Sequence, residues 1–197
     1  MINSEPCRRV GVGSRLHKNR PSGPNWHQKA DRVRMDALAA AGWRVEDIDY
    51  VTCTRLNVNH VGWNARLLDV RWVPTFPNAK CLFPAKELAF STAEATKTPI
   101  SWIEDCVLPI VAAQRPELVA SAYALGDYVR LVTTLGHTID YFSVEPGRNR
   151  ANAFITGDAL QSSLQSQRFH SDHAPRLRSR PSRGGPATDA RASVRHR

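Results

Sequence analysis

The stretch Thr54-Arg55-Leu56-Asn57-Val58-Asn59-His60 carries the strongest structural signal in this chain. The apolar run Tyr50-Val51-Thr52-Cys53 in front of it predicts a buried strand, because short β-branched and aromatic runs pack well in a sheet. The residues that follow, His60-Val61-Gly62-Trp63-Asn64, predict a turn or a short helix. The stretch itself therefore predicts a polar loop at the end of a buried strand.

Two further motifs lie later in the chain. The first is Leu135-Gly136-His137-Thr138, and the second is Thr156-Gly157-Asp158, which follows the apolar run Ala153-Phe154-Ile155. The length of chain between His137 and Asp158 leaves room for a strand, a turn and a second strand. A purely structural interpretation stays open for both motifs, because a His at a strand end, or an Asp after Thr-Gly, can simply complete the hydrogen bonds of a turn.

The three motifs together resemble those of the metallo-β-lactamase superfamily. That family has Thr-His-x-His-x-Asp-His after a strand, then Pro-Gly-His-Thr, then Thr-Gly-Asp. The stretch Trp72-Val73-Pro74-Thr75-Phe76-Pro77-Asn78-Ala79 is similar to the lactonase and glyoxalase II-like branch. The resemblance implies an α/β fold, an αββα sandwich that is incomplete here, and an ancestral zinc-dependent hydrolysis of lactone or thioester bonds by two metal ions.

The resemblance also assigns residues to the metal positions of the family. His60, His137 and Asp158 stand at retained ligand positions, and Asp158 is the candidate catalytic residue. Asn57 and Asn59 stand where the family has a His and an Asp, and Arg55 stands where it has the first His. A last His ligand is not identified, since His170 and His173 lie in Arg-rich surroundings without an apolar frame. Tyr141 stands where a His that supports the ligands usually follows.

These substitutions predict a degraded metal centre. Zinc ordinarily needs three or four nitrogen, sulfur or carboxylate donors, and the neutral amide oxygens of Asn57 and Asn59 are poor substitutes. Two good donors remain for each ion, so we expect no zinc or one weakly bound ion. If Arg55 points into the site, we expect its guanidinium to pair with Asp158 in place of a metal.

Composition and charge indicate how the chain is organised. We expect residues 1–24 to be a poorly ordered N-terminal segment, residues 25–165 to form the partial metallo-β-lactamase-like domain, and residues 166–197 to be a disordered basic tail. The formal charge is +9, and that tail holds eight arginines against two aspartates. No long apolar run predicts a spanning helix or a secretory signal, so we expect a cytoplasmic protein without a membrane partner.

Local patterns predict the individual elements. Apolar spacing predicts a helix over residues 26–41 that ends at Gly42 in a left-handed conformation. Residues 67–69 and 71–73 predict a hairpin in which Val70 takes a position better suited to glycine. Further helices are predicted from Pro84 to Phe90 and from Ser101 to Val111, the latter with a Ser101–Glu104 capping box. Strands are predicted over residues 128–132, 141–144 and 152–156.

Three functions follow from these patterns. The first is a metallo-β-lactamase-fold protein whose hydrolysis is weak or lost. The second is a weak mononuclear hydrolase of a small ester-like substrate that uses His60, His137 and Asp158, with Asn57 or Asn59 completing the shell. The third is a polyanion-binding module that acts through the basic tail; because that tail lacks interleaved aromatic residues, nucleic acid is not the expected partner.

Overall fold

The computed structural model describes residues 17–24, 27–29, 32–120, 122–134, 136, 138–148 and 153–160. Outside the described residues lie the first sixteen residues and the predicted tail at 166–197, which includes His170 and His173. His137 lies outside them as well. Within them, no helix is long and apolar enough to cross a membrane.

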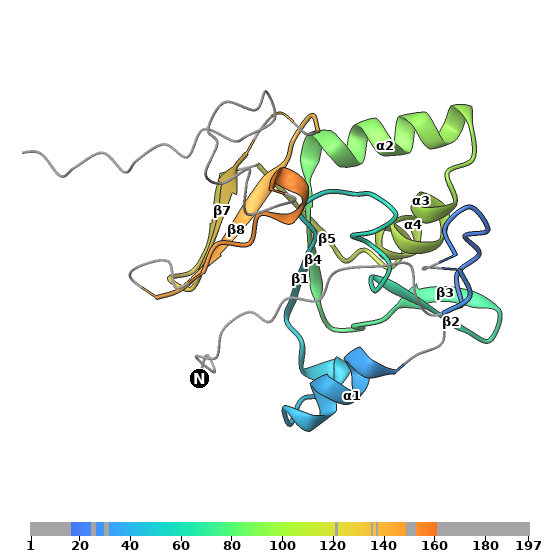
Figure 1. Ribbon diagram of the computed structural model, residues 1–197, viewed down its shortest axis with the longest axis horizontal. Coiled ribbons are helices and arrows are strands. Elements are labelled where there is room, and N and C mark those ends of the chain that lie inside the picture. Colours follow the sequence, from blue (N-terminus) through green and yellow to red (C-terminus); the bar gives the residue numbers. More distant parts are fainter. Residues whose placement is uncertain are drawn as a thin grey trace, which may run out of the picture.

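Two three-stranded sheets form the centre of the fold (Figure 1). The first is parallel and has the order β1 (Tyr50–Thr52), β4 (Lys80–Pro84), β5 (Pro116–Val119). The second is antiparallel and has the order β6 (Tyr123–Leu125), β7 (Val129–Thr133), β8 (Phe142–Pro146). The α/β fold class predicted from the sequence is confirmed.

The central strand β4 shows why the sheets stack. Successive side chains of a strand point to opposite faces, so Leu82 and its neighbours Cys81 and Phe83 enter different cores. Leu82 packs between the two sheets, in a core that also holds the following residues: Val119, Val129, Leu131, Phe142 and Val144. Cys81 and Phe83 face the helices on the other side of the parallel sheet. Both faces of this sheet are therefore covered, as Figure 1 shows.

Two short helices and one longer helix accompany the parallel sheet. They are α2 (Ala85–Lys97), α3 (Ser101–Cys106) and α4 (Leu108–Ala112). Helix α2 begins directly after Pro84, as predicted, but continues past Phe90 to Lys97. From α3 and α4, buried apolar side chains, Ile103, Cys106, Val107 and Ile110, complete the helix-side core.

The predicted single helix over residues 101–111 is wrong in two respects. It is broken at Val107, because Pro109 has no N–H to donate to the carbonyl of Asp105. That carbonyl instead accepts a hydrogen bond from the ammonium of Lys18 at 3.0 Å. The predicted capping box is also absent, because Ser101 is the first helical residue and the N-cap, Ile100, makes no side-chain cap bond.

The first helix, α1 (Val33–Ala40), is shorter than the predicted helix over residues 26–41. The start of the predicted helix instead pairs with an earlier segment. The backbone N–H of Gln28 donates to the carbonyl of Lys18, and that of His17 donates to the carbonyl of Lys29. The predicted end is confirmed, because Gly42 has φ +81°. A short 3-10 helix, η1 (Val45–Asp47), then leads into β1.

The predicted hairpin is confirmed as β2 (Ala65–Leu68) paired antiparallel with β3 (Arg71–Pro74). Its two turn residues, Asp69 and Val70, have φ +46° and +59°. This left-handed geometry matches the twist of two-residue hairpins but disfavours a β-branched residue such as valine.

The last strand predictions are partly correct. Strands β7 and β8 lie within one or two residues of the predicted ranges. The predicted strand over residues 152–156 is reduced, in the part that is described, to a single bridge between Ile155 and Val144. The chain then enters a 3-10 turn, η2 (Gly157–Ala159), beside the loop that follows β1. Strands β5 and β6 were not predicted.

Candidate active site at the ends of β1 and β8

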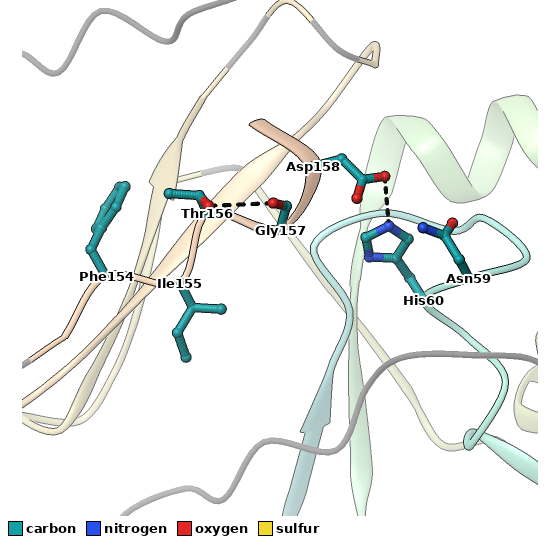
Figure 2. Close-up of a pocket in the computed structure, with 7 residues that line it drawn as sticks. All are labelled: Asn59, His60, Phe154, Ile155, Thr156, Gly157 and Asp158. Carbon is teal, nitrogen blue, oxygen red and sulfur yellow. Dashed lines mark hydrogen bonds and ion pairs between the residues drawn. The ribbon is translucent and has the colours of Figure 1, made fainter. Parts of the chain in front are cut away.

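Two loops meet at the candidate site. The loop of residues 54–60 leaves the carboxyl end of β1, and η2 follows the Ile155 bridge to β8. The first loop turns back on itself, because the N–H groups of His60 and Val61 both donate to the carbonyl of Asn57. This turn brings His60 opposite Asp158 (Figure 2).

A carboxylate shared by two basic groups lies at the centre of the site. Oδ2 of Asp158 lies 2.8 Å from Nε2 of His60 and 3.2 Å from Nη2 of Arg55. The side chains of Asp158, His60 and Arg55 are 22%, 7% and 13% exposed, so the cluster is largely shielded from water. Burial alone would raise the pKa of the Asp158 carboxyl, but the hydrogen bond from His60 and the charges of His60 and Arg55 outweigh it and lower that pKa.

Both ring nitrogens of His60 are engaged. Nε2 faces Asp158, and Nδ1 lies 3.2 Å from the hydroxyl Oγ1 of Thr54. A neutral imidazole has one N–H and one lone pair. Because the contact with a carboxylate needs the proton on Nε2, the lone pair of neutral His60 is on Nδ1, where Thr54 can donate to it. A zinc ion could bind this ring only if one of these two contacts were given up.

The turn that carries Asp158 lies on two buried hydroxyl groups. Oη of Tyr141 accepts the N–H of Asp158 at 2.5 Å and donates to the carbonyl of Thr156 at 2.8 Å. Gly157 between them has φ +56°, and a Cβ there would lie 2.2 Å from Tyr141 Oη and 2.5 Å from Thr54 Oγ1. Glycine is therefore required both for the backbone conformation and for the close approach.

The first turn of α2 links the same loop to the segment after β7. The buried carboxylate of Glu87 accepts the N–H of Leu56 at 2.9 Å and the hydroxyl of Thr138 at 3.3 Å. Asp140 accepts the N–H of Lys86 at 3.2 Å. Burial raises the pKa of Glu87, and the two hydrogen bonds oppose that shift. Sequence patterns gave no signal for Glu87, because its partners lie far from it in the chain.

The structure places the residues that the sequence singled out as follows. His60, Asp158 and Arg55 come together, and Asn59 lies beside His60 (Figure 2). The amide oxygen of Asn57 accepts the N–H of the next residue, Val58, at 2.5 Å. His137 is outside the described residues, so its place as a ligand stays a prediction. Among the residues that are described, no group of three or more His, Cys, Asp or Glu side chains could hold a metal ion.

A pocket of about 410 Å³ opens beside the cluster, between the first loop and η2. In Figure 2, Asp158, His60 and Asn59 form its polar end, and Phe154 and Ile155 lie at the other end. The remaining lining residues are Thr156 and Gly157. A pocket with polar groups at one end and apolar side chains at the other suits a small molecule that has both kinds of surface.

Comparison with known proteins finds similarity to solved structures but none to protein-family models or curated sequences. No protein-family model and no curated protein matches the sequence. A probable metal-dependent hydrolase from Staphylococcus aureus superposes with a TM-score of 0.60 at 15% identity, over 76% of this chain and 53% of that chain. A quorum-quenching N-acyl homoserine lactone hydrolase gives 0.57 at 18% identity, over 80% and 59%. AbOPH, a hydrolase in the beta lactamase superfamily, gives 0.56 at 21% identity, over 79% and 53%.

These similarities extend to other N-acyl homoserine lactonases, one of which is described as a dizinc enzyme. The chain spans about half the length of the solved structures it matches. At these identities the similarity concerns the arrangement of the chain. The protein therefore has the metallo-β-lactamase fold that these lactonases and metal-dependent hydrolases share.

Proposed function

We propose that this chain is a metallo-β-lactamase-fold protein of the lactone- or thioester-hydrolase type with a degraded metal centre, so that its hydrolytic activity is weak or lost. The pocket beside Asp158 would still take a small ester-like molecule. The ion pair between Arg55 and Asp158 is the observation that carries this proposal.

The donor groups do not fit a pair of zinc ions. Asp158 already contacts Arg55 and His60 through one oxygen, and both nitrogens of His60 are engaged. The amide oxygen of Asn57 accepts the N–H of Val58. A cation also repels the guanidinium: two unit charges 4 Å apart cost about 4 kcal/mol at an effective dielectric of 20, and a dication roughly doubles that. No hydrolytic step through zinc is therefore derived for this site.

Arg55 also balances the charge that a metal would otherwise balance. One guanidinium neutralises one carboxylate. The cluster can therefore hold the two loops together without an ion. It cannot supply the lowered water pKa that a bound metal gives to hydrolases.

The test is the metal content and hydrolytic activity of the full chain purified without chelator. We expect less than one equivalent of zinc, and no turnover of lactone or thioester substrates above the rate without protein. About two equivalents of zinc, together with hydrolysis that Asp158→Ala abolishes, would refute the proposal.

The two alternatives give different results in the same preparation. A weak mononuclear hydrolase would bind about one equivalent of metal, and its turnover would be lost in Asp158→Ala. Polyanion binding through residues 166–197 stays a prediction, because these residues lie outside the described part of the chain. Salt-sensitive retention on DNA that is lost on deletion of this segment would support it.

A further inference from the structure

Tyr141 links the candidate site to the core of the fold. Its side chain is fully buried, and it immediately precedes β8. The phenol oxygen accepts the N–H of Asp158 and donates to the carbonyl of Thr156, so one atom holds both ends of the turn. Because β8 pairs with β7 along its length, this atom is fixed by the antiparallel sheet rather than by the loops of the site.

The turn cannot move closer to Tyr141 without a steric clash, and it cannot move away without losing its hydrogen bonds to the phenol. The backbone of Gly157 lies so near that a Cβ would overlap the phenol oxygen. The bond from the Asp158 N–H is short, at 2.5 Å. The direction in which the Asp158 side chain leaves the backbone is therefore set by this contact.

Polar contacts connect four residues in a ring. From Tyr141 Oη the ring runs to the N–H of Asp158, from the Asp158 carboxylate to His60 Nε2, and from His60 Nδ1 to Thr54 Oγ1. Thr54 Oγ1 in turn lies 3.3 Å from Tyr141 Oη.

The protons of this ring can be assigned. The phenol proton goes to Thr156, which is the shorter of its two contacts, and the Thr54 proton goes to His60 Nδ1. The remaining imidazole proton then lies on Nε2, toward Asp158. With His60 neutral, each of the three shorter contacts has one proton, and the 3.3 Å contact between Thr54 and Tyr141 has none.

We propose that Tyr141 is the positioning residue of this site: by holding the turn of Thr156 to Asp158, it directs the carboxylate onto His60 Nε2 and keeps the imidazole proton there. The role concerns the orientation of Asp158, since Tyr141 itself is not among the residues that line the pocket. It deepens the proposed function and rests on it in one respect, namely that no metal ion takes the place of the Nε2 proton. Burial raises the pKa of Tyr141, so the phenol keeps the proton that it donates.

Nitrogen chemical shifts of the His60 ring test this role in the full chain. Histidine would be labelled with ¹⁵N, and spectra that correlate ring nitrogens with ring protons would be recorded in the presence of a chelator. The His60 signals are those that disappear in His60→Gln. We expect wild-type His60 to carry its proton on Nε2, as a slowly exchanging resonance.

The decisive variant is Tyr141→Phe, which removes only the phenol oxygen. We expect the Nε2 proton resonance of His60 to be lost and the nitrogen shifts to move toward the average of the two tautomers. The control is Tyr123→Phe, which also removes one phenol oxygen: the Tyr123 hydroxyl donates to the carboxylate of Glu117 at 2.6 Å and makes none of the contacts of the site. It should leave the His60 signals in place. If Tyr141 only stabilised the fold, Tyr141→Phe would lower the thermal stability of the protein without changing the His60 signals.

Thr54→Val provides a second route if Tyr141→Phe does not fold. It removes the partner of His60 Nδ1 but leaves Tyr141 on the turn, so the Nδ1 shift should move while the Nε2 proton persists. Loss of the Nε2 proton in Thr54→Val, a wild-type proton on Nδ1, or unchanged signals in folded Tyr141→Phe would each overturn the positioning role. None of these results bears on zinc content or turnover. Bound zinc with hydrolysis would instead overturn the proposed function while leaving the response of the metal-free chain to Tyr141→Phe as it is.

Discussion

The guanidinium of Arg55 and the carboxylate of Asp158 form an ion pair with Nη2 3.2 Å from Oδ2. The two residues come from different halves of the site, one from the loop after β1 and the other from η2. The pair therefore joins two segments that are far apart in sequence. It also occupies one side of the carboxylate that the family resemblance assigns to metal binding.

Replacing Arg55 with Met should destabilise the fold by about 1–3 kcal/mol, because it leaves a partly buried carboxylate without its cation. The free energy of unfolding in urea measures this loss. Arg130→Met is the matched control, since Arg130 pairs with Glu145 but its side chain is 60% exposed. We expect that control to cost less than about 1 kcal/mol. Equal losses in the two variants would show that Arg55 contributes no more than a surface charge.

Restoring the family's ligands should restore metal binding. In the variant that combines Arg55→His, Asn57→His and Asn59→Asp, the repelling guanidinium is gone and three donors are added. We expect at least one equivalent of zinc, measured by elemental analysis after dialysis, against less than one for the wild type. The single change Arg55→His is the control, since it removes the repulsion but supplies one donor only. If the triple variant folds and takes up no more zinc than the wild type, missing ligands are not what limits binding.

Two of the three motifs, those that contain His60 and Asp158, meet in the structure, but their contacts could not be described from the sequence. The family resemblance assigned His60 and Asp158 to ligand positions, and Arg55 was expected to pair with Asp158 if it pointed into the site. The anchoring of Asp158 by Tyr141 could not be predicted, because it depends on the bridge that places the segment around Ile155 beside β8. Glu87 was missed for a similar reason: it receives the N–H of Leu56 only because α2 starts beside that loop.

Asp158 should make the stability of the protein depend on pH in acid. Its pKa is lower in the folded chain than its ordinary value, because the contacts with His60 and Arg55 outweigh the effect of burial. A carboxyl of this kind stabilises the fold fully above the unfolded-state pKa, about 3.9, and that contribution is lost as the pH falls through the folded pKa.

The variant Asp158→Asn keeps the shape of the side chain but has no such dependence. We therefore expect it to be less stable than the wild type near neutral pH and the difference to shrink as the pH falls below about 4. Urea denaturation at a series of pH values from about 3 to about 7 would follow this change, because the range includes the ordinary titration of an aspartate. A difference that stays constant across this range would mean that the carboxylate gains nothing from its partners.

Val70 should be a position at which a substitution stabilises the protein. It has φ +59° and its side chain is 92% exposed, so the strained backbone is not offset by packing. Val70→Gly should raise the free energy of unfolding by roughly 0.5–1 kcal/mol, since relief of the left-handed strain exceeds the entropy that glycine costs. The exposed helical residue Val33 is a control, because Val33→Gly should destabilise. No gain at Val70 would mean that the turn relaxes at no cost.

This hairpin also shows what sequence could establish about the fold. Asp69 and Val70 lie between two runs that alternate like strands, so the pairing and even the awkward turn were predictable. The late start of α1 was not, because it depends on the pairing of the Gln28 N–H with the carbonyl of Lys18. Such contacts between distant segments override local helix signals. The break after α3 has a cause in the sequence, Pro109, and the prediction of a single helix overlooked it.

Gly157 provides a test of how tightly the turn lies against the phenol. Gly157→Ala places a Cβ 2.2 Å from Tyr141 Oη and 2.5 Å from Thr54 Oγ1, in a residue with φ +56°. Gly126 has nearly the same backbone, φ +54°, but nothing lies within 4 Å of a Cβ there. Gly126→Ala therefore measures the left-handed strain alone, about 1–2 kcal/mol. We expect Gly157→Ala to cost a further 1–3 kcal/mol or so from overpacking against groups that the two sheets hold in place. Equal losses in urea denaturation would show that Tyr141 and Thr54 can move aside, and the ring of polar contacts would then be too loose to orient Asp158.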